Sequence, residues 1–89
     1  MSTIHLLIKG KVQGVFYRAS TKKMAVAIGI TGWVRNKDNG DVELLVTGTQ
    51  IQLEKFVDWC RQGPAGAVVN ELIETEQEEM IFDSFSIRH

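Results

Sequence analysis

A glycine-bracketed segment that ends in arginine, GKVQGVFYR, occupies residues 10–18. It joins a strand-like run to a helix-like run, so the loop N–H groups and the free N–H groups of the helix start converge on one point and carry partial positive charge. Arg18 adds a guanidinium group, whose planar donors match phosphate oxygens in pairs. Residues 10–18, hereafter the cradle loop, therefore predict a binding site for a phosphate-like anion.

The cradle loop lacks the groups on which other phosphate enzymes depend. A cysteine phosphatase needs a thiolate six positions before its arginine, where this chain has Val12. A nucleotide P-loop needs glycine, four residues and then Gly-Lys followed by Ser or Thr, and no such run occurs. His5, His89 and the acids of residues 71–79 show no metal-ligand spacing. We therefore expect a site without metal or cofactor.

Charge is distributed unevenly along the chain. Residues 1–37 carry seven Lys and Arg and no acid, whereas residues 38–89 carry eleven acids and three bases. The two parts have formal charges of +7 and −8, which sum to the net charge of −1. A positive half favours small anions as ligands, and the acidic remainder argues against a broad nucleic-acid surface. The alternative is that the charges intermix once the chain folds.

Length and composition predict one domain over residues 1–89. A hydrophobic content of 44% suffices for a core without disulfides. The single cysteine, Cys60, cannot form an internal disulfide and falls on an apolar stripe, so we expect a core residue in a reducing, cytoplasmic compartment. The apolar run at residues 4–8 is too short for a signal peptide or a membrane span, so no membrane association is expected.

Hydrophobic periodicity predicts the element order β-α-β-β-α-β. The predicted strands are residues 4–9, 32–36, 41–47 and 68–75, and the predicted helices are residues 19–28 and a segment between Gly48 and Gly63 that Thr49 caps. Asn39-Gly40 predicts a hairpin turn, and Glu76–Glu79 a solvated turn. Phe85 and Ile87 add a short C-terminal edge strand. This order describes an α+β ferredoxin-like sandwich, an antiparallel sheet with two helices on one face.

The fold constrains where Asn36 lies. A helix of about ten residues descends roughly 15 Å from the cradle loop, and a returning strand recovers that height in about five residues. Asn36 therefore returns to the level of the cradle loop and can share a site with Arg18. The sequence leaves open which face each side chain takes. From the residues alone, capping the turn before Asn39-Gly40 is the preferred role of Asn36, because Asn is a common turn residue.

Two motifs stand in order with a family-like spacing, VQGVFYR at 12–18 and GWVRN at 32–36. Gly40, Val42 and Gly48 follow, then Gly63-Pro64 and the closing Phe85-Ser86-Ile87. Over nearly its whole length the chain resembles the acylphosphatases, small enzymes that hydrolyse the carboxyl-phosphate bond of acyl phosphates. Tyr17 stands where many members carry Phe, which is a mild variation.

The resemblance implies that Asn36 orients the attacking water and that Arg18 binds the phosphate group. The loop amides implied to assist are those of Gln13, Gly14, Val15, Phe16, Tyr17 and Arg18. A carboxylate leaving group, with a pKa near 4, departs without a protein acid, so no catalytic histidine is needed. The implied partners are an acyl phosphate and inorganic phosphate, and we expect a monomer.

Two other functions stay open from the residues alone. A non-catalytic anion-binding or interaction module would need Arg18 and not Asn36, so the presence of both favours an enzyme. A nucleic-acid binder of the RNA-recognition type shares the element order, but residues 41–47 lack the stacking aromatics that it needs.

Overall fold

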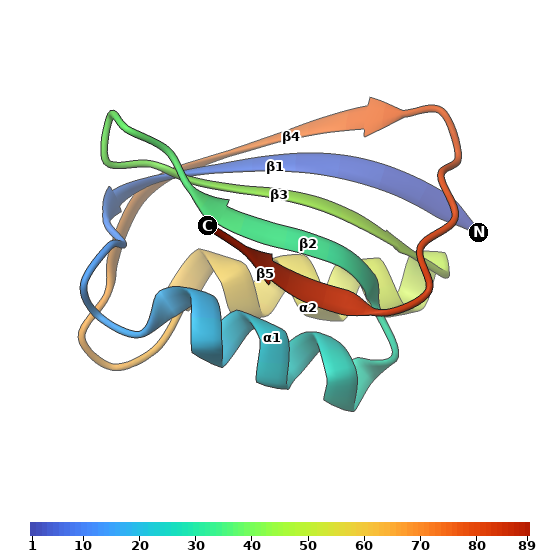
Figure 1. Ribbon diagram of the computed structural model, residues 1–89, viewed down its shortest axis with the longest axis horizontal. Coiled ribbons are helices and arrows are strands. Elements are labelled where there is room, and N and C mark those ends of the chain that lie inside the picture. The colour runs from blue at the N-terminus through green and yellow to red at the C-terminus, as the bar shows by residue number, and fades with distance from the viewer.

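Two helices cover one face of a five-stranded sheet in the computed structural model, which describes residues 1–89 (Figure 1). The elements are β1 (Ser2–Lys11), α1 (Tyr17–Ile28), β2 (Thr31–Asn36), β3 (Val42–Gly48), α2 (Gln50–Gln62), β4 (Val68–Gln77) and β5 (Phe85–Arg88). The strands lie in the order β4-β1-β3-β2-β5. The predicted ferredoxin-like sandwich with two helices on one face is thus confirmed.

The C-terminal edge strand makes the sheet mixed. The first four strands pair antiparallel, as predicted, whereas β5 pairs with β2 in parallel, from Gly32↔Phe85 to Arg35↔Arg88. Strand β4 ends at the opposite end of the sheet from the cradle loop, and the segment between β4 and β5 crosses that end to the other edge, so β5 runs back in the direction of β2 (Figure 1). As a result, the last residues of β2 and β5 lie at the same end of the molecule as the cradle loop.

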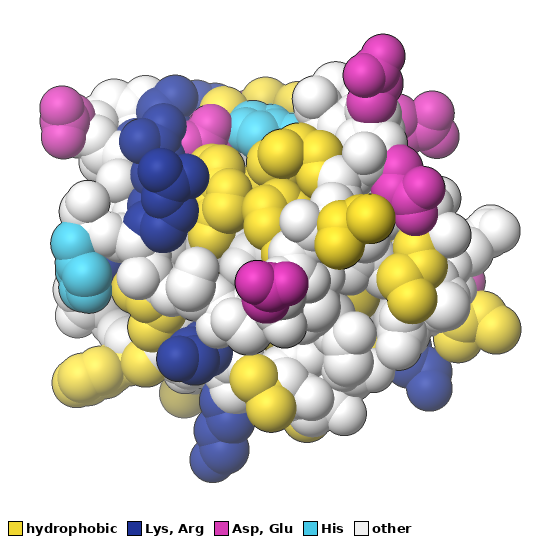
Figure 2. All heavy atoms as spheres, turned by 45° about the vertical axis from the view of Figure 1, so that its right-hand side comes forward, with side chains coloured by type: hydrophobic (Ala, Val, Ile, Leu, Met, Phe, Trp, Pro, Cys, Tyr) yellow, Lys and Arg dark blue, Asp and Glu magenta, His cyan; other side chains and the backbone are white.

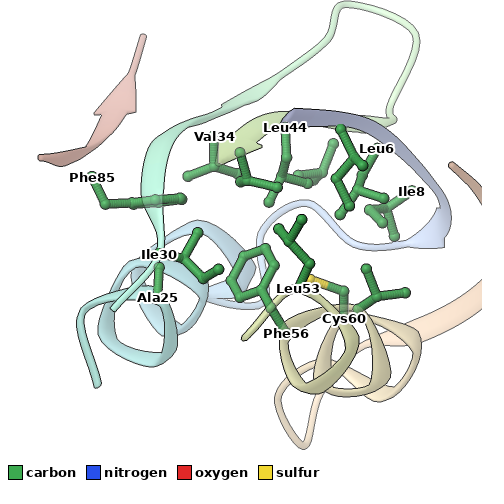
Figure 3. Packing of buried hydrophobic residues seen from close by; sticks show 14 of the residues in the cluster. Leu6, Ile8, Ala25, Ile30, Val34, Leu44, Leu53, Phe56, Cys60 and Phe85 are labelled. Carbon is green, nitrogen blue, oxygen red and sulfur yellow. The ribbon is translucent and has the colours of Figure 1, made fainter. Parts of the chain in front are cut away.

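The core lies between the helices and the inner sheet face (Figure 3). Ile4, Leu6 and Ile8 of β1 are buried, as the alternation predicts. The i, i+3, i+4, i+7 stripe of α2 is also buried and ends in Cys60. Burial raises the pKa of the Cys60 thiol to about 12, so this residue is an inert core group, as expected.

Several predicted boundaries are wrong. Strand β1 extends two residues beyond the predicted range of 4–9 at each end. Strand β4 continues to Gln77, which pairs with Thr3, so the predicted turn at residues 76–79 begins too early. β4 is an edge strand with polar side chains on both faces, and its pattern therefore gives no indication of where pairing stops. Helix α1 starts at Tyr17, two residues before the predicted start. None of the helices is long and apolar enough to cross a membrane.

Candidate active site

The cradle loop turns the chain from the end of β1 into the start of α1. Gly14 has φ 73° and Phe16 has φ 62°, and Phe16 is the only non-glycine residue of the chain with a positive φ. Left-handed residues of this kind build the backbone nests in which successive N–H groups converge on an anion. The local conformation is therefore that of an anion-binding loop.

The N–H groups in the central part of the cradle loop have no backbone partner. Those of Gln13, Gly14, Val15 and Phe16 donate no backbone hydrogen bond. Phe16 is the N-cap of α1 but supplies no side-chain cap, and the first turn of α1 holds no acidic residue. The positive end of the helix and the free donors therefore remain available to a ligand.

Arg18 lies in the first turn of α1 and forms no ion pair with a carboxylate. Its only side-chain hydrogen bond joins Nη1 to Nδ1 of His89, at 3.4 Å. Arg18 and His89 line a cavity of about 340 Å³, a volume near the lower end for small-molecule sites. The guanidinium donors thus face a cavity with little competition for them.

Asn36 ends β2 and lines the same cavity. Its Oδ1 is buried and has no hydrogen-bond partner. The hairpin turn is held instead by Asn39, whose Oδ1 accepts from the N–H of Asp41 at 3.0 Å. An unpartnered buried acceptor costs about 1–3 kcal/mol of stability. The Oδ1 of Asn36 therefore contributes no hydrogen bond to the fold and is free to accept one from a ligand or water.

The side chain of Gln13 connects the cradle loop to the β2–β3 hairpin. Its Nε2 donates to the carbonyl oxygens of Lys37 and Asp41, each at 2.8 Å. The sequence indicated only the backbone N–H of Gln13, because nothing local shows that its amide reaches a hairpin 24 residues away. These two bonds hold the loop beside the end of β2, where Asn36 lies.

The ring of Tyr17 points into the core rather than into the cavity. It is 1% exposed, and its hydroxyl donates to the carbonyl oxygen of Cys60 at 2.6 Å. Burial is the main cause that raises the pKa of Tyr17 above its usual range. Gly63 makes room for this ring, since a Cβ there would lie 2.6 Å from Tyr17 Cε2. Tyr17 therefore ties the start of α1 to the end of α2.

The two parts of opposite charge pair across the sheet. Lys9 Nζ contacts Asp41 Oδ2 at 2.8 Å, and Glu43 pairs with both His5 and Arg35. The hydrogen bond from Lys9 lowers the pKa of Asp41 below its usual range. On the face shown in Figure 2, most basic side chains lie toward one end, whereas acidic ones lie at both ends and in the middle. Acidic and basic side chains therefore do pair on the sheet after folding. None of these carboxylates pairs with Arg18.

A larger hollow of about 580 Å³ lies elsewhere, against α2 and β4. Its lining includes four carboxylates, those of Glu54, Asp58, Glu74 and Glu76, and a single base, Arg61. A phosphate ligand would be repelled there. No three His, Cys, Asp and Glu side chains lie close enough together to hold a metal ion.

A family model, similar sequences and a solved structure all indicate the same family. The acylphosphatase family model matches residues 4–87. The chain belongs to the acylphosphatase family. An acylphosphatase of Syntrophus aciditrophicus is 46% identical over 98% of this chain and 92% of its own, and one of Marinobacter nauticus is 51% identical over 81% and 78%. The crystal structure of acylphosphatase from Bacillus subtilis has a TM-score of 0.96 at 31% identity and covers both chains completely. The predicted family and the predicted enzyme class, an acyl-phosphate hydrolase, are confirmed.

The geometry of this acylphosphatase brings together the residues that the motifs indicated. Gln13, Gly14, Phe16, Tyr17, Arg18 and Asn36 all line the 340 Å³ cavity, whereas Val15 packs against the core. Ile87 and His89 line it as well and were missed. They reach the cavity only through the parallel pairing of β5 with β2, which no local pattern indicates.

Proposed function

We propose that Arg18 and the cradle-loop amides bind the phosphoryl group of an acyl phosphate, and that Asn36 positions the water that attacks it in line. The observation that carries the proposal is the buried, unpartnered Oδ1 of Asn36 in the same cavity as the guanidinium of Arg18. That oxygen is free to accept a hydrogen bond from water, and the amide Nδ2 is a donor. The other amide side chain at the cavity, that of Gln13, has its Nε2 engaged by the carbonyl oxygens of Lys37 and Asp41.

The reaction needs little more than binding and alignment. The water oxygen forms a bond to phosphorus while the bond to the carboxylate oxygen breaks, and the carboxylate leaves with the electron pair. One hydrogen of the water stays on the attacking oxygen and the other passes to a phosphate oxygen, so both end on the phosphate product. Because the transition state of phosphoryl transfer is loose, fixed positive charge at the equatorial oxygens supplies most of the acceleration.

The leaving group explains why no general acid is required. A carboxylate is the conjugate base of an acid with a pKa near 4, so it departs as an anion at neutral pH. A phosphate monoester releases an alkoxide or phenoxide, which needs protonation in the transition state. The site is therefore suited to acyl phosphates and poorly suited to monoesters.

Phosphate release from a small panel of substrates tests the proposal. Purified protein, freed of contaminating phosphatase, should hydrolyse benzoyl and acetyl phosphate and should leave phenyl phosphate almost untouched. Equal rates on the ester would show that the site contains a proton donor. Binding of inorganic phosphate without turnover of any acyl phosphate would instead favour a non-catalytic anion-binding module.

A further inference from the structure

Phe16 is an exposed aromatic side chain at the mouth of the cavity. The residue is 82% exposed, although it adjoins the buried Tyr17 in the chain. Its backbone is left-handed, with φ 62° and ψ 24°. Phe16 lines the same cavity as Arg18 and Asn36. An aromatic residue thus lines the same cavity as Arg18 and Asn36 and is open to solvent.

Phe16 combines an exposed aromatic side chain with a left-handed backbone, and the occurrence of both at one residue calls for an explanation. Single exposed apolar residues are common on protein surfaces. A bulky residue in the left-handed region, however, is a rare and strained choice, and Gly or Asn would fit this backbone better. The cradle loop needs the conformation for its N–H groups and has no need of a ring, so the ring is explained by contact with a ligand.

The apolar part of the cavity is larger than a phosphate needs. Phosphate oxygens require donors, which the loop amides and Arg18 supply. Beside them the lining includes Ala19 and the half-buried Ile87, and their apolar surface has no role toward phosphate. In an acyl phosphate the acyl group is joined to the phosphoryl group through one oxygen, so it must lie next to the cradle loop. Phe16 is the one exposed large hydrophobic residue of that lining.

We propose that Phe16 is a specificity-determining residue that stacks against the acyl group, so that the enzyme favours acyl phosphates with an aromatic or other apolar acyl group over acetyl phosphate. The proposal rests on the function proposed above. Offset or edge-to-face contact between aromatic rings contributes beyond burial of area. The contact is made by the part of the substrate that differs between acyl phosphates, and it therefore affects their ranking.

Replacing Phe16 by Ala removes the ring and keeps a residue with a Cβ in the same left-handed conformation. We expect kcat/KM for benzoyl phosphate to fall roughly tenfold, with acetyl phosphate changing less than about twofold. Phe16→Tyr keeps the ring and should retain the preference. Competition by benzoylphosphonate, which cannot be hydrolysed, should weaken by a similar factor, while competition by inorganic phosphate stays the same.

Ile81→Ala is the matched control, because Ile81 is 90% exposed and does not line the cavity. It should change neither substrate. Equal losses for both substrates in Phe16→Ala, together with weaker phosphate competition, would overturn the proposal and assign Phe16 to the shape of the loop. Unchanged kinetics in Phe16→Ala would overturn it and leave the proposed function standing. Failure of the unmodified protein to hydrolyse either acyl phosphate would overturn both.

Discussion

The two helices of this small protein begin in opposite ways. At the start of α2, the hydroxyl of Thr49 accepts from the N–H of Gln52, and the side chain of Gln52 accepts from the N–H of Thr49, which completes a capping box. At the start of α1, Phe16 supplies no cap and the loop N–H groups stay free. Both helices have the same need for acceptors at their first turns.

The two helix starts therefore differ in role: the start of α2 contributes to stability, and the start of α1 leaves donors for a ligand. Helix α2 satisfies the N–H groups of Thr49 and Gln52 from its own sequence, through the capping box. The first N–H groups of helix α1 lie beside the cavity of Arg18 and Asn36 and have no acceptor from a cap, so an anion can accept their hydrogen bonds. Changes at Arg18 should therefore alter function far more than stability, and changes at the capping box of α2 should do the reverse.

The largest effect is expected from Arg18→Ala. It removes the only guanidinium at the cavity, and we expect kcat/KM for acyl phosphates to fall about 10³-fold or more, with weaker competition by inorganic phosphate. Arg18→Lys keeps the charge, loses the planar fork and should recover only part of the activity. Steady-state kinetics with phosphate as competitor measures both effects. A loss of less than tenfold would mean that the loop amides alone bind the phosphoryl group.

Asn36→Ala should separate turnover from binding. We expect kcat to fall about 10²–10³-fold, with the Kd for inorganic phosphate almost unchanged, because the phosphate contacts remain. The free energy of unfolding should stay level or rise, since the variant removes a buried acceptor without a partner. Calorimetric phosphate binding and urea unfolding give the two controls. If the protein unfolded more easily and activity followed stability, a structural role for Asn36 would replace the catalytic one.

Tyr17→Phe tests the tie between the two helices. It removes the hydroxyl that donates to the carbonyl of Cys60 and leaves the ring in place. We expect a loss of about 1–3 kcal/mol in the free energy of unfolding, because that carbonyl keeps no other side-chain partner, and we expect kcat within about twofold of the unmodified protein. Urea unfolding measures the first quantity. A large loss of activity at full stability would show that the hydroxyl acts in the site.

The smallest effect should come from Thr49→Ala, which opens the capping box of α2. We expect a cost of about 1 kcal/mol in unfolding free energy, the usual value for loss of an N-cap. Phosphate should raise the melting temperature of this variant by the same amount as in the unmodified protein. A change in phosphate affinity would contradict the comparison, because α2 would then contribute to the ligand site.

Much of the fold follows from short-range patterns. The stripe that ends in Cys60, the cap at Thr49, the turn at Asn39-Gly40 and the alternation of Ile4, Leu6 and Ile8 each involve residues only a few positions apart. Such patterns can be predicted from the sequence because helix and strand periodicity, capping and turn formation depend on residues that are close along the chain. The glycine-rich cradle loop and Arg18 belong to the same class, and they indicated an anion site before any tertiary contact was known.

Only the folded chain decides which polar groups remain without partners. The sequence alone predicted an α+β sandwich and the family, which are confirmed, and a phosphate-binding loop, which stays a prediction. Tertiary structure decided that Lys9 and Arg35 are paired with carboxylates while Arg18 is not, and that Asn39 rather than Asn36 holds the turn. It also brought His89 to Arg18, across 71 positions, through the parallel strand β5. The physical reason is that hydrogen bonds and ion pairs are chosen among groups that meet only after the sheet has formed.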